Sequence, residues 1–285
     1  MSLSPSDYFT QGERKMSELT TDGTTKKYDD AAILFQKAGT QFSKARNFLR
    51  AGESYRRATD CMLHSKQLDQ AAHFAIESGK NYAKAKGGSE KAFEAFNIAL
   101  QMYEQLNKTV LANKLTIEAA KIFESNKEYD KSIHYHELAV ESYKAQNKTQ
   151  DFLREKKAIC TLLILSNKWK DAATIYEQLF VDLSSQGIEK NAIEYGVFCI
   201  LCHLANHDTV TTRGTNDKYG TINKLWSSSE ESQFLKDLVM QLVAKNVAQV
   251  QSICKQFNDK FKYGTTFDNI VTSLMSTYKG DTIIQ

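Results

Sequence analysis

The chain has 285 residues, and its 37 lysines and arginines nearly balance its 34 aspartates and glutamates, which gives a formal net charge of +3. This balance argues against nucleic acid as a partner, because nucleic-acid-binding domains usually carry a clustered basic stripe and a pI above about 9. The sequence has neither the ~18 apolar residues that span a bilayer nor the basic start and apolar segment of a signal peptide, so we expect a soluble, cytoplasmic protein.

Several similar segments recur along the sequence and indicate a helical repeat. Each segment opens on an aromatic or large apolar residue, mostly followed by small residues three and four positions later, and the openings are Tyr28, Leu68, Tyr129 and Trp169. Partner segments begin near Asn47, Asn107, Asn147 and Ile188, so a new apolar segment starts about every 20 residues. A helical hairpin of this kind cannot bury its apolar face alone, which predicts that neighbouring hairpins stack into a solenoid.

The composition changes after Asn206. The segment HDTVTTRGTNDKYGT, residues 207–221, is rich in Thr, Asp and Gly and is predicted to be a loosened connection. Apolar periodicity returns between Phe234 and Phe257, and a last helix is expected over 267–278. We therefore predict an all-α fold, a right-handed superhelical solenoid of tetratricopeptide-like hairpins. Its expected parts are an N-terminal helix and loop (1–27), a hairpin array (28–206) and a C-terminal helical bundle (207–285).

Cysteine and histidine residues offer the only candidates for metal or haem chemistry. The five cysteines are odd in number and mostly at apolar positions, as expected of reduced core thiols. Cys199-Ile200-Leu201-Cys202-His203 has the spacing of a c-type haem site, which belongs to exported proteins. Cys199, His203 and His207 recur every four residues beside Asp208, and this leaves a metal site as an alternative to simple packing. We expect packing, with no metal and no cofactor.

No phosphate-binding loop or nucleophile elbow is present, so an enzyme is not expected. Basic residues recur instead along the second helices of the hairpins: Arg46, Arg50, Arg56, Arg57, Lys108, Lys114, Arg154, Lys156 and Lys157. A subset that shares the concave face would form an electropositive trough for an elongated acidic partner, such as a helical bundle. For any one of them, a solvated surface charge is the simpler alternative.

Four segments resemble helices of the soluble NSF attachment protein (SNAP) family, nearest its alpha and beta branch: YDDAAILFQKAGTQFSKARNFLRAG, NKTVLANKLTIEAAKIFE, WKDAATIYEQL and FDNIVTSLMSTYKGD. The resemblance covers nearly the whole chain and rests on the sum of these segments. It implies a non-enzymatic adaptor of vesicle trafficking and membrane fusion. Several copies of such an adaptor coat the four-helix SNARE bundle of syntaxin-type proteins and present their C-terminal domain to the hexameric ATPase NSF, which takes the bundle apart.

The resemblance also assigns residues to the contact with SNAREs. Basic positions of the family that touch the SNARE bundle correspond to Arg46, Lys108, Lys114 and Arg154, and a further lysine position holds Ala158 with Lys157 beside it. Another family arginine is replaced by Glu230. The SNARE-facing charge is therefore expected to be largely kept.

Other family features are altered. The glutamates that meet NSF correspond to Met240, Val243 and Ala244, while Asp208 and, in the tail, Asp281 and Ile284 are the remaining candidates for contact with NSF. The membrane-attachment loop, which has paired phenylalanines in the family, reads Ser17-Glu18-Leu19 here, so membrane association through it is expected to be weak or absent. The protein would then reach membranes peripherally, through SNAREs.

These observations leave one leading function and three alternatives. The leading hypothesis is a SNAP-type adaptor that binds SNARE complexes and recruits NSF for their disassembly. The first alternative is a mimic or decoy that binds SNAREs without productive recruitment of NSF. The others are a tetratricopeptide-like scaffold for unrelated peptides and the metal protein considered above.

Overall fold

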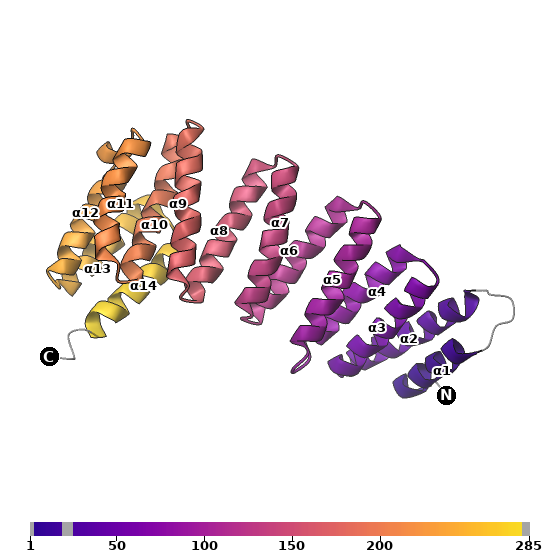
Figure 1. The fold of residues 1–285 in the computed structure, drawn as a ribbon. Helices are drawn as coiled ribbons and strands as arrows, with labels where there is room; N and C mark the ends of the chain where they lie inside the picture. Colours follow the sequence, from indigo (N-terminus) through magenta and orange to yellow (C-terminus); the bar gives the residue numbers. More distant parts are fainter. Residues whose placement is uncertain (1–2, 19–24, 281–285) are drawn as a thin grey trace. The chain divides into compact units, whose positions relative to one another are not determined.

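The protein is all-α over the part of the chain that its structure describes. The computed structural model describes residues 3–18 and 25–280, which form fourteen α-helices and one 3-10 helix without a strand (Figure 1). The predicted α-solenoid is thereby confirmed. The chain forms two compact units, residues 1–148 (unit 1) and residues 149–285 (unit 2). The predicted division into an N-terminal helix and loop, a hairpin array and a C-terminal bundle, with boundaries at residues 27 and 206, remains a prediction.

Unit 1 is a run of helices in which each helix packs against the next one in the chain. They are α1 (Pro5–Ser17), α2 (Lys26–Lys44), α3 (Phe48–His64), α4 (Leu68–Tyr82), α5 (Ser89–Gln105), α6 (Thr109–Ser125) and α7 (Tyr129–Ala145). Ser4 starts α1 with a capping box, in which its hydroxyl accepts from the N–H of Asp7 and the Asp7 carboxylate accepts from the N–H of Ser4.

The period of about 20 residues comes from helices of one length that are joined by turns of one length. Helices α5 to α10 each have 17 residues, and three-residue turns link them. Each turn contains one residue in the left-handed conformation, such as Asn107 (φ 54°) or Lys127 (φ 61°). The next N–H then donates back to the helix that has just ended, as Lys108 does to the carbonyl of Tyr103 at 2.8 Å. This Schellman geometry satisfies the last carbonyls of each helix and fixes where the next one begins.

Rings and small residues fill the spaces between the helices of unit 1. Phe123 and Tyr135 stack with their ring centroids 5.7 Å apart, and both are fully buried. The ring of Tyr82 lies directly on Gly52, where a Cβ atom would be 2.6 Å from ring carbon Cδ1. Glycine is therefore needed in the middle of α3 for close packing and not for a bend.

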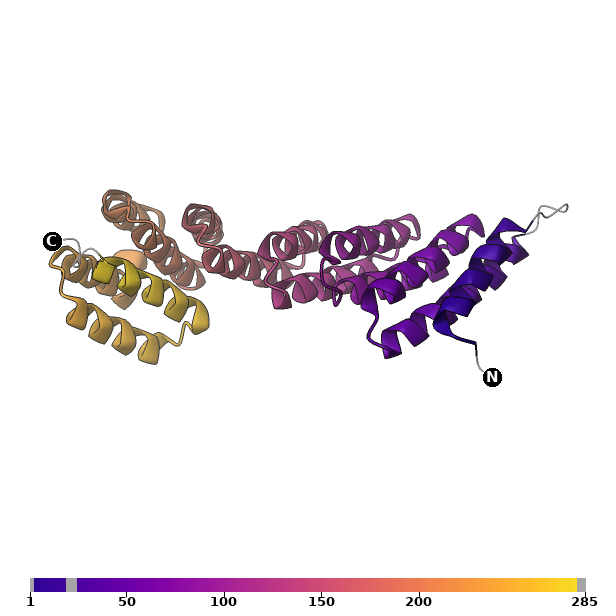
Figure 2. The same cartoon turned by 90° about the horizontal axis from the view of Figure 1, so that it is seen from below.

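Unit 2 is built around one buried helix. Its elements are α8 (Thr149–Leu165), α9 (Trp169–Ser185), α10 (Glu189–Ala205), α11 (Thr209–Ile222), η1 (Trp226–Ser228), α12 (Glu230–Val243), α13 (Val247–Phe261) and α14 (Thr265–Gly280). Helix α10 contacts α9, α11, α12 and α14, and it is apolar around most of its circumference, as a core helix should be. Helices α13 and α14 form an antiparallel pair at the end of the chain (Figure 2).

The predicted loosened connection at 207–221 is wrong, because helix α11 covers most of that segment. Asp208 caps the helix by accepting from the N–H of Thr211 at 2.9 Å. Tyr219 is fully buried and stacks on Phe180 of α9 with ring centroids 3.9 Å apart. One cap and one long-range aromatic contact thus hold as a helix a segment whose composition favours turns.

Candidate functional site

Arg46, the first predicted SNARE contact, lies in the turn between α2 and α3. Its backbone is left-handed (φ 57°), and the following N–H, that of Asn47, donates to the carbonyl of Phe42 at 2.9 Å. The turn projects the side chain away from the core, and Arg46 is exposed. It makes no ion pair within residues 3–18 and 25–280, so its full charge is available to a partner.

The two predicted lysines of α6 differ in their surroundings. Lys108 is the N-cap residue of α6, and its ammonium group pairs with the carboxylate of Asp69 at the start of α4. Lys114, in the middle of α6, is exposed and has no ion-pair partner among the described residues. Within unit 1 the three predicted cations therefore occupy a turn, a helix start and a helix middle, and Lys108 is partly neutralised by the protein itself.

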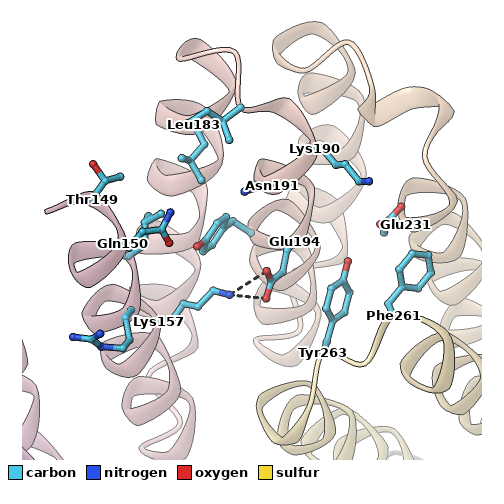
Figure 3. A pocket seen from close by; sticks show the side chains of 14 residues that line it. Thr149, Gln150, Lys157, Leu183, Lys190, Asn191, Glu194, Glu231, Phe261 and Tyr263 are labelled. Carbon is cyan, nitrogen blue, oxygen red and sulfur yellow. Dashed lines mark hydrogen bonds and ion pairs between the residues drawn. The ribbon is translucent and has the colours of Figure 1, made fainter.

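In unit 2, Arg154 and Lys157 are brought together. Both line a hollow of about 610 Å³, walled by α8, α10 and the connection between α13 and α14 (Figure 3). Arg154 contacts Asp151 at 2.7 Å and Glu155 at 2.9 Å, and these hydrogen bonds, with Glu155 first, raise the pKa of the guanidinium. The Nζ of Lys157 lies 2.9 and 3.0 Å from the two carboxylate oxygens of Glu194. Both predicted cations of the hollow are thus paired with carboxylates of the protein itself.

Aromatic and apolar side chains complete the hollow. The ring of Tyr195 lies beneath Lys157, with the ammonium 5.3 Å from its centroid, and burial raises the pKa of Tyr195 to about 12. Tyr263 and Phe261 stand on the opposite wall, and burial, followed by the carboxylate of Glu231, raises the pKa of Tyr263. Tyrosines with raised pKa values stay neutral at physiological pH, so the cations and carboxylates alone set the charge of the hollow.

One group of cations in unit 1 was, apart from Arg46, not identified from the sequence. Three alternate connections, α2–α3, α4–α5 and α6–α7, meet along one edge of this unit, because the ammonium of Lys84 lies over the Phe48 ring and Asn126 donates to the carbonyl of Ala83 at 3.0 Å. The exposed cations of this edge, here called the basic rim, are Lys44, Arg46, Lys84, Lys86 and Lys127. None of the five forms an ion pair with another described residue. Their even spacing in the turns was the signal available in the sequence.

On α12, the structure exposes the residues that the resemblance matches to family glutamates. Met240 and Val243 are each 58% exposed, and Ala244, which ends the helix, is exposed as well. Met240 and Val243 line a shallow hollow of about 330 Å³ that also includes Val239 and Lys236. The three side chains at positions 240, 243 and 244 are apolar, Asp217 lines the same hollow, and basic Lys245 stands in the turn that follows.

Comparison with known proteins decides the family. The sequence profile described as "Soluble NSF attachment protein, SNAP" matches residues 4–279. The chain belongs to the SNAP family. The alpha-soluble NSF attachment protein of Vitis vinifera is 24% identical over 253 residues, which cover 87% of this chain and 85% of the relative. The human alpha protein is 22% identical over 261 residues, covering 91% and 88%. As a SNAP-family member, the chain is a non-enzymatic attachment protein.

Other matches agree with this assignment. The alpha-soluble NSF attachment protein of Saccharomyces cerevisiae is 25% identical over 236 residues, covering 82% of this chain and 80% of the relative. Among solved structures, aspartyl phosphate phosphatase F of Bacillus subtilis aligns with 95% of this chain and 69% of its own, at 12% identity. Its TM-score of 0.35 is too low to bear on fold or function.

Some of the remaining candidate contacts of this SNAP-family chain lie within the described residues, and others lie outside them. Asp208 caps α11, and its hydrogen bonds with Thr211 lower the pKa of its carboxyl. Asp281 and Ile284 lie outside the described residues. In the segment predicted to correspond to the family's membrane-attachment loop, Ser17 ends α1 and donates to the carbonyl of Arg14, and Glu18 pairs with Lys15 at 2.9 Å. Leu19 also lies outside the described residues.

The cysteine and histidine candidates of this family member differ in burial. Cys199 and Cys202 are fully buried on α10, and burial raises the pKa of Cys199 to about 12. His203 is half-buried, and His207 is exposed in the turn that follows α10. The described residues contain no group of three His, Cys, Asp or Glu side chains that could hold a metal ion. Within residues 3–18 and 25–280, every helix is too short or too polar to span a bilayer.

Proposed function

We propose that this chain is an adaptor that binds SNARE complexes through exposed cations and recruits an NSF-type ATPase, which disassembles them in vesicle trafficking. The observation that carries the proposal is the family match over residues 4–279. The relatives that match over most of their length are themselves named NSF attachment proteins. The proposal places the protein in the cytoplasm and on membranes through its partners.

The arrangement of charge supports contact with an elongated acidic partner. Arg46 and Lys114 are exposed and unpaired among the described residues, and the other cations of the basic rim extend the positive charge along one edge of unit 1. Cations that face an acidic partner speed its association and fix its register more than they raise its final affinity. Lys108, Arg154 and Lys157 would join the contact only by exchanging their present carboxylate partners.

The decoy remains as a second candidate function because of α12. Met240, Val243 and Ala244 are all exposed and uncharged, so the three positions that carry glutamates in the family offer no negative charge to basic residues of NSF here. Each close charge pair lost from an interface typically costs on the order of 1 kcal/mol or more, and about 1.4 kcal/mol is a factor of ten in affinity. SNARE binding with little NSF recruitment is the outcome that this surface favours.

Co-sedimentation of the purified protein with a preassembled SNARE bundle tests both functions. NSF held by a non-hydrolysable nucleotide is added to one of two parallel samples. Co-migration of all three components is the result expected of an adaptor, and migration with SNAREs alone identifies a decoy. Failure to bind the SNARE bundle would overturn both proposals and leave a scaffold for other peptides as the remaining function.

A charge reversal then tests the contact residues. Arg46→Glu with Lys114→Glu should abolish binding to the SNARE bundle while the circular dichroism stays unchanged, because neither side chain holds the fold together. The matched control is Lys91→Glu with Lys144→Glu, an equal charge change at exposed, unpaired residues of α5 and α7 in the same unit. Equal losses in both double variants would show that net charge, and not these two residues, drives binding.

A further inference from the structure

Three of the five proposed contact cations are already paired with carboxylates of the protein itself. Lys108 pairs with Asp69, Arg154 with Asp151 and Glu155, and Lys157 with Glu194. The last pair joins α8 to α10 across the hollow of unit 2, and both oxygens of Glu194 accept from the ammonium (Figure 3). A carboxylate of the protein that is paired with a predicted binding cation competes for that cation with the carboxylates of the partner.

We propose that Glu194 is a specificity-determining residue of the SNARE-binding surface: its carboxylate holds Lys157 inside the hollow and competes for it with an acidic side chain of the partner. The inference rests on the proposed function, because it requires an acidic partner that reaches this hollow. It assigns a role to a residue of α10 that the resemblance to the SNAP family did not single out.

Access to the pair makes such an exchange possible. The side chain of Lys157 is 43% exposed and that of Glu194 is 32% exposed, so the pair stands at the open side of the hollow. An ion pair with this exposure adds little to the stability of a fold, because water screens it. A partner carboxylate can therefore replace Glu194 without unfolding its surroundings, and the Tyr195 ring continues to support the ammonium from below.

The neighbouring charges explain why the competition selects among partners. The hollow is lined by three cations, Arg154, Lys157 and Lys190, and by two carboxylates, those of Glu194 and Glu231. Glu231 interacts with the hydroxyl of Tyr263 and forms no ion pair with a cation of the described residues. With Glu194 in place, a loosely acidic segment gains little, since it must displace a carboxylate that already has two hydrogen bonds. Only a partner whose carboxylate contacts Lys157 in good hydrogen-bonding geometry offsets the loss of the pair between Lys157 and Glu194.

Binding measurements on four proteins test the inference. The Kd for a preassembled, fluorescently labelled SNARE bundle is measured for wild type, Glu194→Gln, Lys157→Gln and the double variant. Glu194→Gln should bind more tightly, by between about twofold and fivefold, the range that an exposed ion pair allows. The double variant should bind like Lys157→Gln alone, because the freed lysine is the source of the gain.

Two controls separate competition from other effects. Glu231→Gln removes an equal charge from the same hollow without freeing a lysine, so it should raise the affinity for the SNARE bundle only a little. Any rise in affinity that it causes should persist in the Lys157→Gln background. Glu194→Asp keeps the charge and should remain close to wild type. A soluble poly-glutamate peptide should gain more affinity from Glu194→Gln than the SNARE bundle does, since it depends on charge alone.

The possible outcomes distinguish this inference from the proposed function. If wild type binds the SNARE bundle and Glu194→Gln binds equally or less tightly with an unchanged thermal midpoint, the competition by Glu194 is refuted and the adaptor function stands. A gain in affinity that persists in the double variant also refutes it. The effect would then come from the net charge around the hollow and not from the freed lysine. If wild type does not bind the SNARE bundle at all, the proposed function fails first.

Discussion

Ion pairing divides the proposed contact cations into two groups with different physical behaviour. Arg46 and Lys114 present an uncompensated charge to solvent, so they act at a distance and are sensitive to salt. Lys108, Arg154 and Lys157 act only at contact, after their own carboxylates have moved. In the proposed function, the first group attracts acidic partners and the second discriminates among them.

Burial at the cysteines leads to a prediction about reactivity. The five thiols are all buried, and burial raises the pKa of Cys160 and of Cys254 to about 12. At pH 8 a thiol of pKa 12 is thiolate in only about one molecule in ten thousand, and the thiolate is the reactive form. We expect Ellman's reagent to modify none of the five quickly in the folded protein and all five in guanidinium chloride.

The same shifts set a pH dependence for stability. Because the folded protein binds these thiol protons more tightly than the unfolded chain does, the contribution of the thiols to the free energy of unfolding is constant below about pH 8.5, where thiols stay protonated in both states. It should fall as the pH rises from there toward 12, and thermal unfolding at pH 7.5 and 9.5 measures the decrease. Rapid modification of a thiol in the folded protein at pH 8 would contradict its burial.

At the level of the helices, the sequence predicted what depends on local chemistry. The repeat was visible because a 17-residue helix and a three-residue turn recur regularly, and both are encoded within 20 residues. Helix α11 was missed because its support is distant in sequence: Tyr219 packs on Phe180, 39 positions earlier. The pairing of Lys157 with Glu194 across 37 positions was hidden for the same reason. Cationic residues could be found from the sequence, but their partners could not.

The close packing of helices in unit 2 predicts that one added methyl group, at Gly196, destabilises the fold. In Gly196→Ala on α10, the new Cβ would lie 2.7 Å from ring carbon Cζ3 of Trp226 and 2.9 Å from Cδ2 of Phe180. Overpacking of a rigid core usually costs about 1–3 kcal/mol, and we expect a loss in that range in urea unfolding. Gly214→Ala on α11, where a Cβ meets nothing within 4 Å, is the control and should be neutral or stabilising. Equal effects would refute the packing argument.

For the whole molecule, the question is whether one chain still connects a SNARE bundle to an ATPase. The cations proposed to meet SNAREs are exposed or lie at an open hollow, and the family match extends almost from end to end. The surface of α12 that is proposed to face NSF exposes Met240 and Val243, with Lys245 in the following turn. The proposed adaptor and decoy functions use the same cations toward SNAREs and differ only in whether this surface of α12 meets NSF.

Restoring charge to α12 separates these functions. In Met240→Glu with Val243→Glu and Ala244→Glu, three carboxylates would stand at exposed positions, and pairs with basic residues of NSF should strengthen ternary complex formation by tenfold or more if each contributes on the order of 1 kcal/mol. The triple Gln variant removes the same apolar surface without adding charge and is the matched control. Carboxylates near the C-terminus of a helix oppose its dipole, so a stability loss of about 0.3–1 kcal/mol per residue is expected and must be measured alongside. If the Glu variant recruits NSF no better than the Gln variant while wild type already forms the ternary complex, this lineage meets NSF through other contacts. If neither variant nor wild type recruits NSF, the decoy function gains its strongest support.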